Sequence, residues 1–319
     1  MKKNSLFNWN LKITAVAIAL GFGLVSCEEE EPPIVETNTI VDVASGNASF
    51  STLVAAVDRA DLVTTLSSPG PFTVFAPTND AFGEFLTANN LTADQLLANP
   101  DLGDILTYHV VSGSVGSSDV APGRVNTAAG VPFYVSQAPD NSLWINGSAQ
   151  ITQTDIAASN GIIHVLDYVI TPPTQNIAEI ATGFAGADAP EFTQLVAALV
   201  RADLVDAFTG GIDDNLTVFA PTDAAFEALY EALGPDVNGV DDIDLELLTN
   251  VLLYHVVPAR AFSQDLRQDA SLPTLLEGSN LTVDLANLQI NDSGLVPSLL
   301  NVHATNGVIH VIDQVLLPG

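Results

Sequence analysis

The sequence predicts an α+β protein built from two similar units. Several segments occur twice in the same order along the 319 residues, and each copy mixes helical with strand-like patterns. The separation between copies drifts from 142 to 146 residues, which is the size of a domain and too long for a solenoid repeat. The repeated segments are RADLV at 59 and 201, TVFAPT at 73 and 217, YHVV at 108 and 254, and NG followed by an apolar run at 160 and 306.

Each unit shows helix signals and strand signals in the same order. The apolar residues Phe50, Leu53, Val54 and Val57 recur at helical spacing, as do Phe226, Leu229, Tyr230 and Leu233 in the second unit. Residues 73–75 and 161–170 are rich in β-branched and aromatic residues, which is typical of strands. Thr78 and Thr222 follow a proline and precede helical runs, so we expect both to be helix N-caps.

The first 26 residues have the pattern of a secretory signal. Lysines precede an apolar run over 13–25, which ends in Leu-Val-Ser before Cys27. The alternative, a membrane anchor helix, needs about 20 apolar residues and leaves the position of the cysteine unexplained. Cys27 is the only cysteine, so an intramolecular disulfide is excluded. The segment resembles the lipobox of bacterial lipoproteins, which implies that Cys27 becomes the lipidated first residue of the mature chain.

An acidic tether follows Cys27 and occupies 27–36. Glu28 to Glu31 and two prolines resemble the export signal that sends lipoproteins of the Bacteroidetes to the outer cell surface. The other interpretation is a solvated, disordered tether, and both can hold together. We therefore expect an outer-membrane lipoprotein of the cell envelope that is exposed at the surface, while periplasmic orientation stays open.

The charge excludes polyanionic partners. The formal net charge is −30, and all three lysines lie in the signal, so removal of the signal leaves −33 with five arginines and no lysine. Nucleic acids and anionic lipid headgroups are bound by Lys and Arg, so neither is an expected partner. The membrane is then reached only through the anchor at Cys27. Acidity on this scale favours solubility at high ionic strength, where screening shortens self-repulsion.

Hydrophobic residues make up 47% of the chain, which is enough for each unit to bury its own core. We place the first unit at 37–171 and the second at 172–319. The junction Thr171-Pro-Pro-Thr174 favours a short extended connection, so we expect the two units to touch.

The repeated motifs together resemble the fasciclin (FAS1) domain family. They are TVFAPT leading into a helix with phenylalanine, YHVV, and NG followed by an apolar strand with Ile-His-Val and aspartate, each present in order in both halves. The resemblance implies two tandem FAS1-like domains, each a β-sandwich wedge flanked by α-helices. It also implies extracellular adhesion through a protein or polysaccharide partner.

The family's Tyr-His motif is matched by Tyr108-His109 and Tyr254-His255. In animal relatives the motif is implicated in cell adhesion, so the resemblance makes these four residues candidate binding residues. Apolar neighbours favour a second interpretation, in which each pair ends a helix and is retained for packing. His164 and His310 lie among apolar residues on both faces of a strand, which indicates hydrogen-bonded core histidines.

Neither catalysis nor a cofactor is indicated by the sequence. It lacks a Gly-x-Ser-x-Gly elbow, a His-Glu-x-x-His helix, a phosphate-binding glycine loop and a Cys-His pairing, so we expect no enzyme, no catalytic residue and no cofactor. An acidic loop over 236–246 leaves a divalent cation contact open, although its spacing fails the EF-hand pattern and no metal ligands are assigned. Its other interpretation is an acidic cap on the following helix.

The expected function is therefore that of a lipid-anchored surface protein that attaches to matrix, glycans or other cells. The alternative is a glycan-capturing lipoprotein in nutrient uptake, with exposed Trp144, Tyr134 or Tyr230 stacking on sugar rings.

Overall fold

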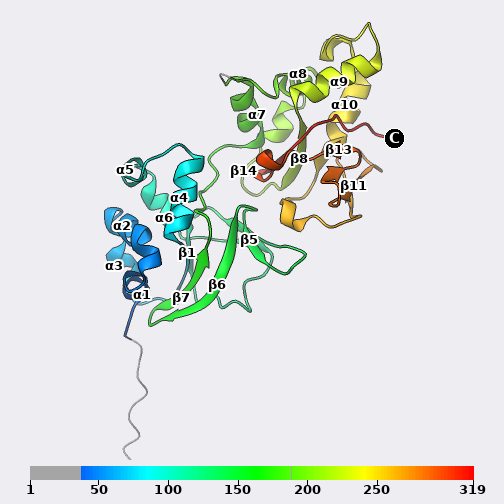
Figure 1. The fold of residues 1–319 in the computed structure, drawn as a ribbon. Helices are drawn as coiled ribbons and strands as arrows, with labels where there is room; N and C mark the ends of the chain where they lie inside the picture. Colours follow the sequence, from blue (N-terminus) through cyan, green and yellow to red (C-terminus); the bar gives the residue numbers. More distant parts are fainter. Residues whose placement is uncertain (1–36, 188) are drawn as a thin grey trace, which may run out of the picture. The chain divides into compact units, whose positions relative to one another are not determined.

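The computed structural model describes residues 37–187 and 189–319 (Figure 1). The expected signal segment, Cys27 and the acidic tether lie outside these residues. Glu36–Gly319 form one compact unit, within which we call 37–171 the first repeat and 172–319 the second repeat. Across the described ranges, no helix combines the length and the apolar character needed to cross a membrane.

The first repeat begins with helices and ends with strands. Its helices are α1 (Ile40–Ser45), α2 (Ser51–Arg59), α3 (Val63–Leu66), α4 (Asn79–Ala88), α5 (Ala93–Leu97) and α6 (Leu102–Tyr108), with a 3-10 turn η1 (Ala48–Phe50) before α2. Its strands are β1 (Phe72–Pro77), β2 (Val110–Ser112), β3 (Gly123–Val125), β4 (Phe133–Gln137), β5 (Leu143–Ile145), β6 (Ala149–Ala158) and β7 (Gly161–Leu166).

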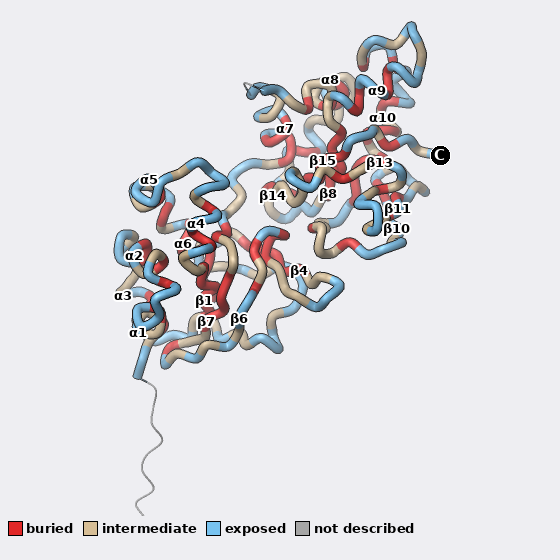
Figure 2. Tube along the Cα trace, in the orientation of Figure 1, coloured by how far each residue is buried: buried red, intermediate tan, exposed pale blue. Residues whose placement is uncertain are grey.

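The seven strands form one sheet in the order β2-β1-β7-β6-β5-β4-β3. Its centre is a parallel pair between the first and the last strand of the repeat, in which Phe72 is opposite Gly161 and Pro77 is opposite Leu166. All other pairings in this sheet are antiparallel. Figure 2 shows most of this central pair as buried chain.

Side chains alternate across the parallel pair and separate two cores. Val74 and Ala76 of β1 pack into a core with the helices, whereas Phe75 between them packs with Phe133 and Ile145 of the other strands. This follows from the period of two along a strand. The sheet is therefore covered by helices on one face and by its own folded-over strands on the other, as expected for a wedge flanked by helices.

The second repeat follows the same plan. Its helices are α7 (Ile177–Ala185), α8 (Thr193–Arg201), α9 (Asp223–Leu233) and α10 (Leu245–Tyr254), with 3-10 turns η2 (Val205–Phe208), η3 (Val240–Asp242), η4 (Ser263–Asp265) and η5 (Pro297–Leu299). Its strands are β8 (Leu216–Pro221), β9 (Val256–Val257), β10 (Ser271–Pro273), β11 (Asn280–Asp284), β12 (Gln289–Ile290), β13 (Ser293–Gly294), β14 (Val302–Ala304) and β15 (Gly307–Ile312).

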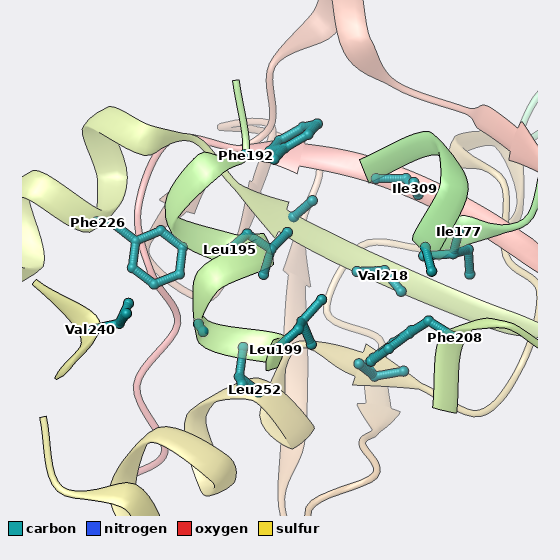
Figure 3. Packing of buried hydrophobic residues seen from close by; sticks show 14 of the residues in the cluster. Ile177, Phe192, Leu195, Leu199, Phe208, Val218, Phe226, Val240, Leu252 and Ile309 are labelled. Carbon is teal, nitrogen blue, oxygen red and sulfur yellow. The ribbon is translucent and has the colours of Figure 1, made fainter. Parts of the chain in front are cut away.

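In the second repeat the strands are divided between two four-stranded sheets, β14-β15-β8-β9 and β10-β11-β12-β13. The parallel pair recurs between β8 and β15, with Leu216 opposite Gly307. Its helical core is drawn in Figure 3, where side chains of α8 such as Leu195 and Leu199 lie beside Val218 of β8 and Leu252 of α10. Phe219, the residue after Val218, packs into the other core.

The predicted helix starts are confirmed, and one predicted strand is too long. The hydroxyls of Thr78 and Thr222 accept hydrogen bonds from the backbone N–H of Ala81 and Ala225 and so cap α4 and α9. The strand expected over 161–170 ends at Leu166. The apolar residues after it are buried without strand pairing, and Ile170 donates its backbone N–H to a histidine ring instead.

A repeated Asn-Gly pair holds the first helix of each repeat to the last strand. The side-chain oxygen of Asn160 accepts from the Ile40 N–H at 2.8 Å, and that of Asn306 accepts from the Ile177 N–H at 2.9 Å. Glycine follows each asparagine because a Cβ at this position would collide with a backbone oxygen of the paired strand, that of Phe72 or Leu216. The NG motif is thus a clamp between the two ends of each repeat.

Candidate functional site

The Tyr-His motif lies at the junction between a helix and a strand in each repeat. Tyr108 is the last residue of α6 and His109 its C-cap, directly before β2, and Tyr254 and His255 end α10 in the same way. The four residues are between 0% and 6% exposed. This placement agrees with the interpretation of the motif as a helix end retained for packing.

Both tyrosine hydroxyls are hydrogen-bonded inside the strand core. Tyr108 donates to the Pro132 carbonyl at 3.0 Å and accepts from the amide of Asn146 at 3.0 Å. Tyr254 repeats the arrangement with the Asn280 carbonyl and the Asn291 amide, both at 3.0 Å. Burial raises the pKa of Tyr108 well above its usual range. The two tyrosine hydroxyls therefore connect the helix end to the start of β4 in the first repeat and of β11 in the second.

His109 and His255 carry their ring proton on the same nitrogen, Nδ1. The backbone N–H of Ile170 donates to Nε2 of His109 at 3.2 Å, and that of Leu316 donates to Nε2 of His255 at 2.9 Å. Since an amide N–H only donates, Nε2 carries no proton, and Nδ1–H donates to the helix carbonyl of Ile105 or Val251. Burial lowers the pKa of each ring to about 4. Each imidazole is a neutral bridge with both nitrogens engaged.

The strand histidines are also engaged on both nitrogens. His164 and His310 are fully buried, as predicted. Nε2 of each lies 2.9 Å from a carbonyl, that of Val115 or Ala261, and Nδ1 accepts a backbone N–H from Asp155 or Asn301 at 3.3 Å. The rings lie against Phe75 and Phe219. A base that must accept a substrate proton needs a free lone pair, and none of these four histidines has one in this fold.

The acidic loop of the second repeat caps a helix. The Asp244 carboxylate accepts from the backbone N–H groups of Glu246 and Leu247, both at 3.0 Å, at the start of α10. Asp242 accepts from the backbone N–H of Asn238 in the same loop. Within 37–187 and 189–319 there is no group of three or more His, Cys, Asp or Glu side chains arranged to hold a metal ion. The helix-cap interpretation of Asp244 is confirmed.

Two of the three aromatic residues considered for sugar stacking are buried. Tyr134 is 9% exposed and Tyr230 is 7% exposed, and the Tyr230 hydroxyl donates to Gln194 at 2.8 Å. Trp144 is half-buried and donates its indole N–H to Ser142 at 2.9 Å. These three residues therefore do not form one exposed aromatic surface.

Sequence reasoning did not assign the asparagines that hold this framework. Asn146 and Asn291 each connect the motif tyrosine to the neighbouring strand by also accepting a backbone N–H, from Tyr134 or Thr282. Asn160 and Asn306 form the clamps described above. The detectable signal was their recurrence at separations of 145 and 146 residues, which lie within the range of 142 to 146 residues between the repeated motifs.

The fold is thus a tandem of two α+β repeats in which the shared motifs hold strands and helices together. The chain belongs to the fasciclin domain family, because the family model of the Fasciclin domain matches residues 48–172 and again residues 190–318. It is 51% identical over 136 residues to Protein sll1483 of Synechocystis sp., which covers 42% of this chain and 74% of that protein.

Longer relatives match across both repeats. The chain is 28% identical over 302 residues to transforming growth factor-beta-induced protein ig-h3 of Sus scrofa, which covers 93% of this chain and 42% of that protein. Among solved structures, a FAS1 domain pair from the insect cell adhesion molecule Fasciclin I aligns with a TM-score of 0.37 at 18% identity, over 86% of this chain and 98% of that one. This chain spans less than half of the length of the ig-h3 protein of Sus scrofa.

Proposed function

We propose that this protein is a lipid-anchored adhesion or binding protein of the cell surface, which attaches the cell to matrix, glycans or other cells. The observation that carries the proposal is the match of the fasciclin domain family to both repeats, over 48–172 and 190–318. The anchor is Cys27, and the acidic tether over 27–36 holds the repeats away from the membrane.

The contact surface lies outside the repeated motifs. The motif tyrosines and histidines are buried and hydrogen-bonded, so they position the fold and offer a partner no polar atom. The residues available to a partner belong to the loops and outer helix faces, where the two repeats differ in sequence. With no lysine after the signal and a charge of −33 on the mature chain, this surface favours a basic or neutral protein or an uncharged polysaccharide.

Catalysis has no support in the site. The four histidines that occur in both repeats have both ring nitrogens engaged, and the acidic loop is used as a cap. A binding role needs none of these groups to react. We therefore assign the protein to binding rather than to an enzyme class.

Anchoring is tested by metabolic labelling with palmitate. The wild-type chain should incorporate label and the Cys27→Ser variant should not, while protease treatment of whole cells should degrade the wild-type protein if the tether directs it outward. If the wild-type chain incorporates no palmitate, the proposal of a lipid anchor at Cys27 is wrong, whatever the result for adhesion.

Adhesion is tested separately by deletion. Cells lacking the protein should attach less to matrix-coated surfaces and aggregate less, and the wild-type chain should restore both. The Cys27→Ser variant is the matched control, because its repeats are intact and only the membrane attachment is lost. Unchanged attachment and aggregation in the deletion strain would overturn the adhesive role.

Glycan capture in nutrient uptake is the weaker proposal. It depends on Trp144, because Tyr134 and Tyr230 are buried. A glycan array probed with the wild-type protein and with Trp144→Ala tests this second proposal. Binding that is lost in the variant would support a glycan site at Trp144, and an array without signal would contradict glycan capture.

A further inference from the structure

The two repeats meet through a specific contact that no repeated motif explains. It joins β4 and the end of β5 in the first repeat to the segment 260–267 and the start of β14 in the second repeat. Because Glu36–Gly319 form one compact unit, this contact is internal to the chain. The contact between the units that the short junction predicted is confirmed.

An aromatic and cationic cluster forms the centre of the contact. Tyr134 of β4 packs with Phe262 and Val308, which are 1% and 0% exposed. The guanidinium carbon of Arg260 lies 4.3 Å from the centre of the Tyr134 ring, and the His303 ring meets the same tyrosine edge-on at 6.1 Å. Arg260 is itself held in place by backbone carbonyls of its own repeat, including Ala304 and Gly307. A desolvated arginine on a tyrosine face is a favourable cation–π pair.

Hydrogen bonds surround this cluster. The carbonyl of Gly147 accepts from Asn301 at 2.9 Å and from Gln264 at 3.0 Å. Ser136 donates to the Asp265 carboxylate at 2.8 Å. Two further arginines complete the boundary, because Arg267 donates to the Gln137 carbonyl at 2.6 Å and Arg124 pairs with Asp213 at 2.7 Å.

Gly147 fits this contact for two independent reasons. Its φ is +67°, which disfavours residues with a side chain. A Cβ at Gly147 would also lie 2.6 Å from Cγ of Asn301 in the other repeat. Any larger residue would displace the Asn301 side chain from its hydrogen bonds to the Gly147 carbonyl and the Ser263 hydroxyl.

The anchors occur only on the faces that meet. Equivalent positions in the two repeats are identified by the hydrogen bonds that they share. The backbone N–H of Tyr134 donates to Asn146, and that of Thr282 donates to Asn291 in the same way. The backbone N–H of Val115 donates to the threonine of β1, and that of Ala261 donates to the threonine of β8. The unused faces have small or acidic residues instead of the anchors. Thr282 replaces Tyr134, Asp292 replaces Gly147, Ser114 replaces Arg260, Gly116 replaces Phe262 and Ala157 replaces His303.

Charge opposes this docking. The first repeat has 12 carboxylates and two arginines, a formal charge of −10, and the second has 21 carboxylates and three arginines, a formal charge of −18. Three of these five arginines lie at the contact. Two touching domains of about 140 residues have centres about 37 Å apart. Their repulsion is screened at about 1 M salt, where the Debye length is about 3 Å, but acts across the pair at about 0.01 M, where it is about 30 Å.

We propose that the contact between the repeats is a salt-dependent latch, which docks them into one rigid pair at high ionic strength and releases them at low ionic strength. The cation–aromatic cluster and the bonds to Gly147 supply the short-range attraction, and screening removes the long-range repulsion. The latch depends neither on a ligand nor on adhesion. Its test is therefore independent of the test of the proposed function.

The test measures the distance between the repeats by pulsed electron paramagnetic resonance. The full chain carries Cys27→Ser, so that two introduced cysteines, Ala88→Cys on α4 and Ala232→Cys on α9, are the only thiols. Both positions are exposed and face neither the contact nor a core. We expect one narrow distance distribution at about 1 M NaCl and a broad, longer one at about 0.01 M.

Two glycine variants separate the latch from backbone strain. Gly147→Ala should give a broad distribution at both salt concentrations. Gly130→Ala is the matched control, because Gly130 also has positive φ, +79°, but nothing lies within 4 Å of its Cβ position. Gly130→Ala should behave like the unsubstituted chain, and circular dichroism should show both variants folded.

A second pair of variants tests the cluster itself. Tyr134→Thr introduces the residue found at the equivalent position of the second repeat and should broaden the distribution, while Thr282→Tyr on the unused face should leave it unchanged. A distribution that is equally narrow at both salt concentrations overturns the salt dependence. A narrow distribution in folded Gly147→Ala and Tyr134→Thr overturns the latch.

Discussion

The imidazole of His109 accepts the backbone N–H of Ile170, which follows 61 residues later in the chain, at 3.2 Å. His255 and Leu316 form the same bond in the second repeat, also 61 residues apart, at 2.9 Å. In each case the ring lies at the end of a helix and its partner lies in the segment after the last strand of the repeat. The histidine therefore connects the middle of each repeat to its end, and this connection depends on the ring being neutral.

Acid should destabilise the protein through these rings. The pKa values of His109, His255 and His310 are lowered by burial to about 4, below the unfolded value of about 6.5. The unfolded state therefore binds more protons below pH 6.5, and the free energy of unfolding should fall as pH falls from about 6.5 to about 4. The full loss is about 3 kcal/mol for each ring. Urea titrations across this range measure the slope.

The matched variant for this slope is His109→Gln, which retains a side-chain amide and does not titrate. It should show a shallower decrease of the unfolding free energy over the same range than the wild-type chain. Equal slopes in both proteins would contradict a role of His109 in the acid response.

Removal of one motif hydroxyl should cost stability without changing the fold. Tyr108→Phe leaves the Pro132 carbonyl and the Asn146 amide without their partner in a buried site, so we expect a loss of about 1 to 3 kcal/mol in the free energy of unfolding. Tyr254→Phe should cost a similar amount in the second repeat. In a double-mutant cycle, Tyr108→Phe and Asn146→Ala should be less costly together than the sum of the single changes. Strict additivity would show that the two groups do not act as one network.

The asparagine clamp should be among the most sensitive polar positions. Asn160 accepts from Ile40 and donates to the carbonyls of Leu66 and Ser68, so Asn160→Ala leaves two buried groups and one partly buried group unpaired and should cost about 2 to 4 kcal/mol. Asn126→Ala is the control, because Asn126 is exposed and its side chain forms no hydrogen bond within the described residues. Its effect should be within about 0.5 kcal/mol. Chemical denaturation of both variants makes the comparison.

The acidic loop should depend on its capping geometry. Asp244→Ala removes the acceptor of two backbone N–H groups at the start of α10 and should lower stability by about 1 kcal/mol, whereas Asp244→Asn should retain most of the cap. The difference should be the same in EDTA and in millimolar Ca²⁺. A loss in Asp244→Ala that occurs only with Ca²⁺ present would instead assign the loop to cation binding.

Local signals in the sequence predicted the helix starts and the strand centres. Thr78 and Thr222 were recognisable as caps because the cap, the proline and the following helix are adjacent in the chain. The end of β7 was not recognisable, because an apolar run is equally compatible with a strand and with buried irregular chain. Residues 167–170 leave the sheet, where Tyr168 packs on Phe85 and Ile170 is bound by His109. Those partners lie far away in sequence.

The sequence predicted that the histidines of the site are buried, but it did not predict their hydrogen-bond partners. The apolar neighbours of the histidines indicated burial, which holds for all four that occur in both repeats. Which nitrogen accepts and which residue donates depends on packing between segments about 60 residues apart, and no local pattern encodes that. The sequence predicted that the repeats touch, but the residues that form the contact were missed for a related reason. Its anchors, such as Tyr134 and Gly147, are the positions at which the two copies differ, so a search for repetition passes over them.

The parallel pairing of β1 with β7, and of β8 with β15, determines when each repeat can fold. The central strand of the sheet is made early and its partner about 90 residues later, so the core stays open until synthesis of the repeat is complete. A fragment that ends before Gly307 should stay protease-sensitive in its second repeat while the first repeat is protected. The order of strands thus leaves the core of each repeat incomplete until the last strand of that repeat has been synthesised.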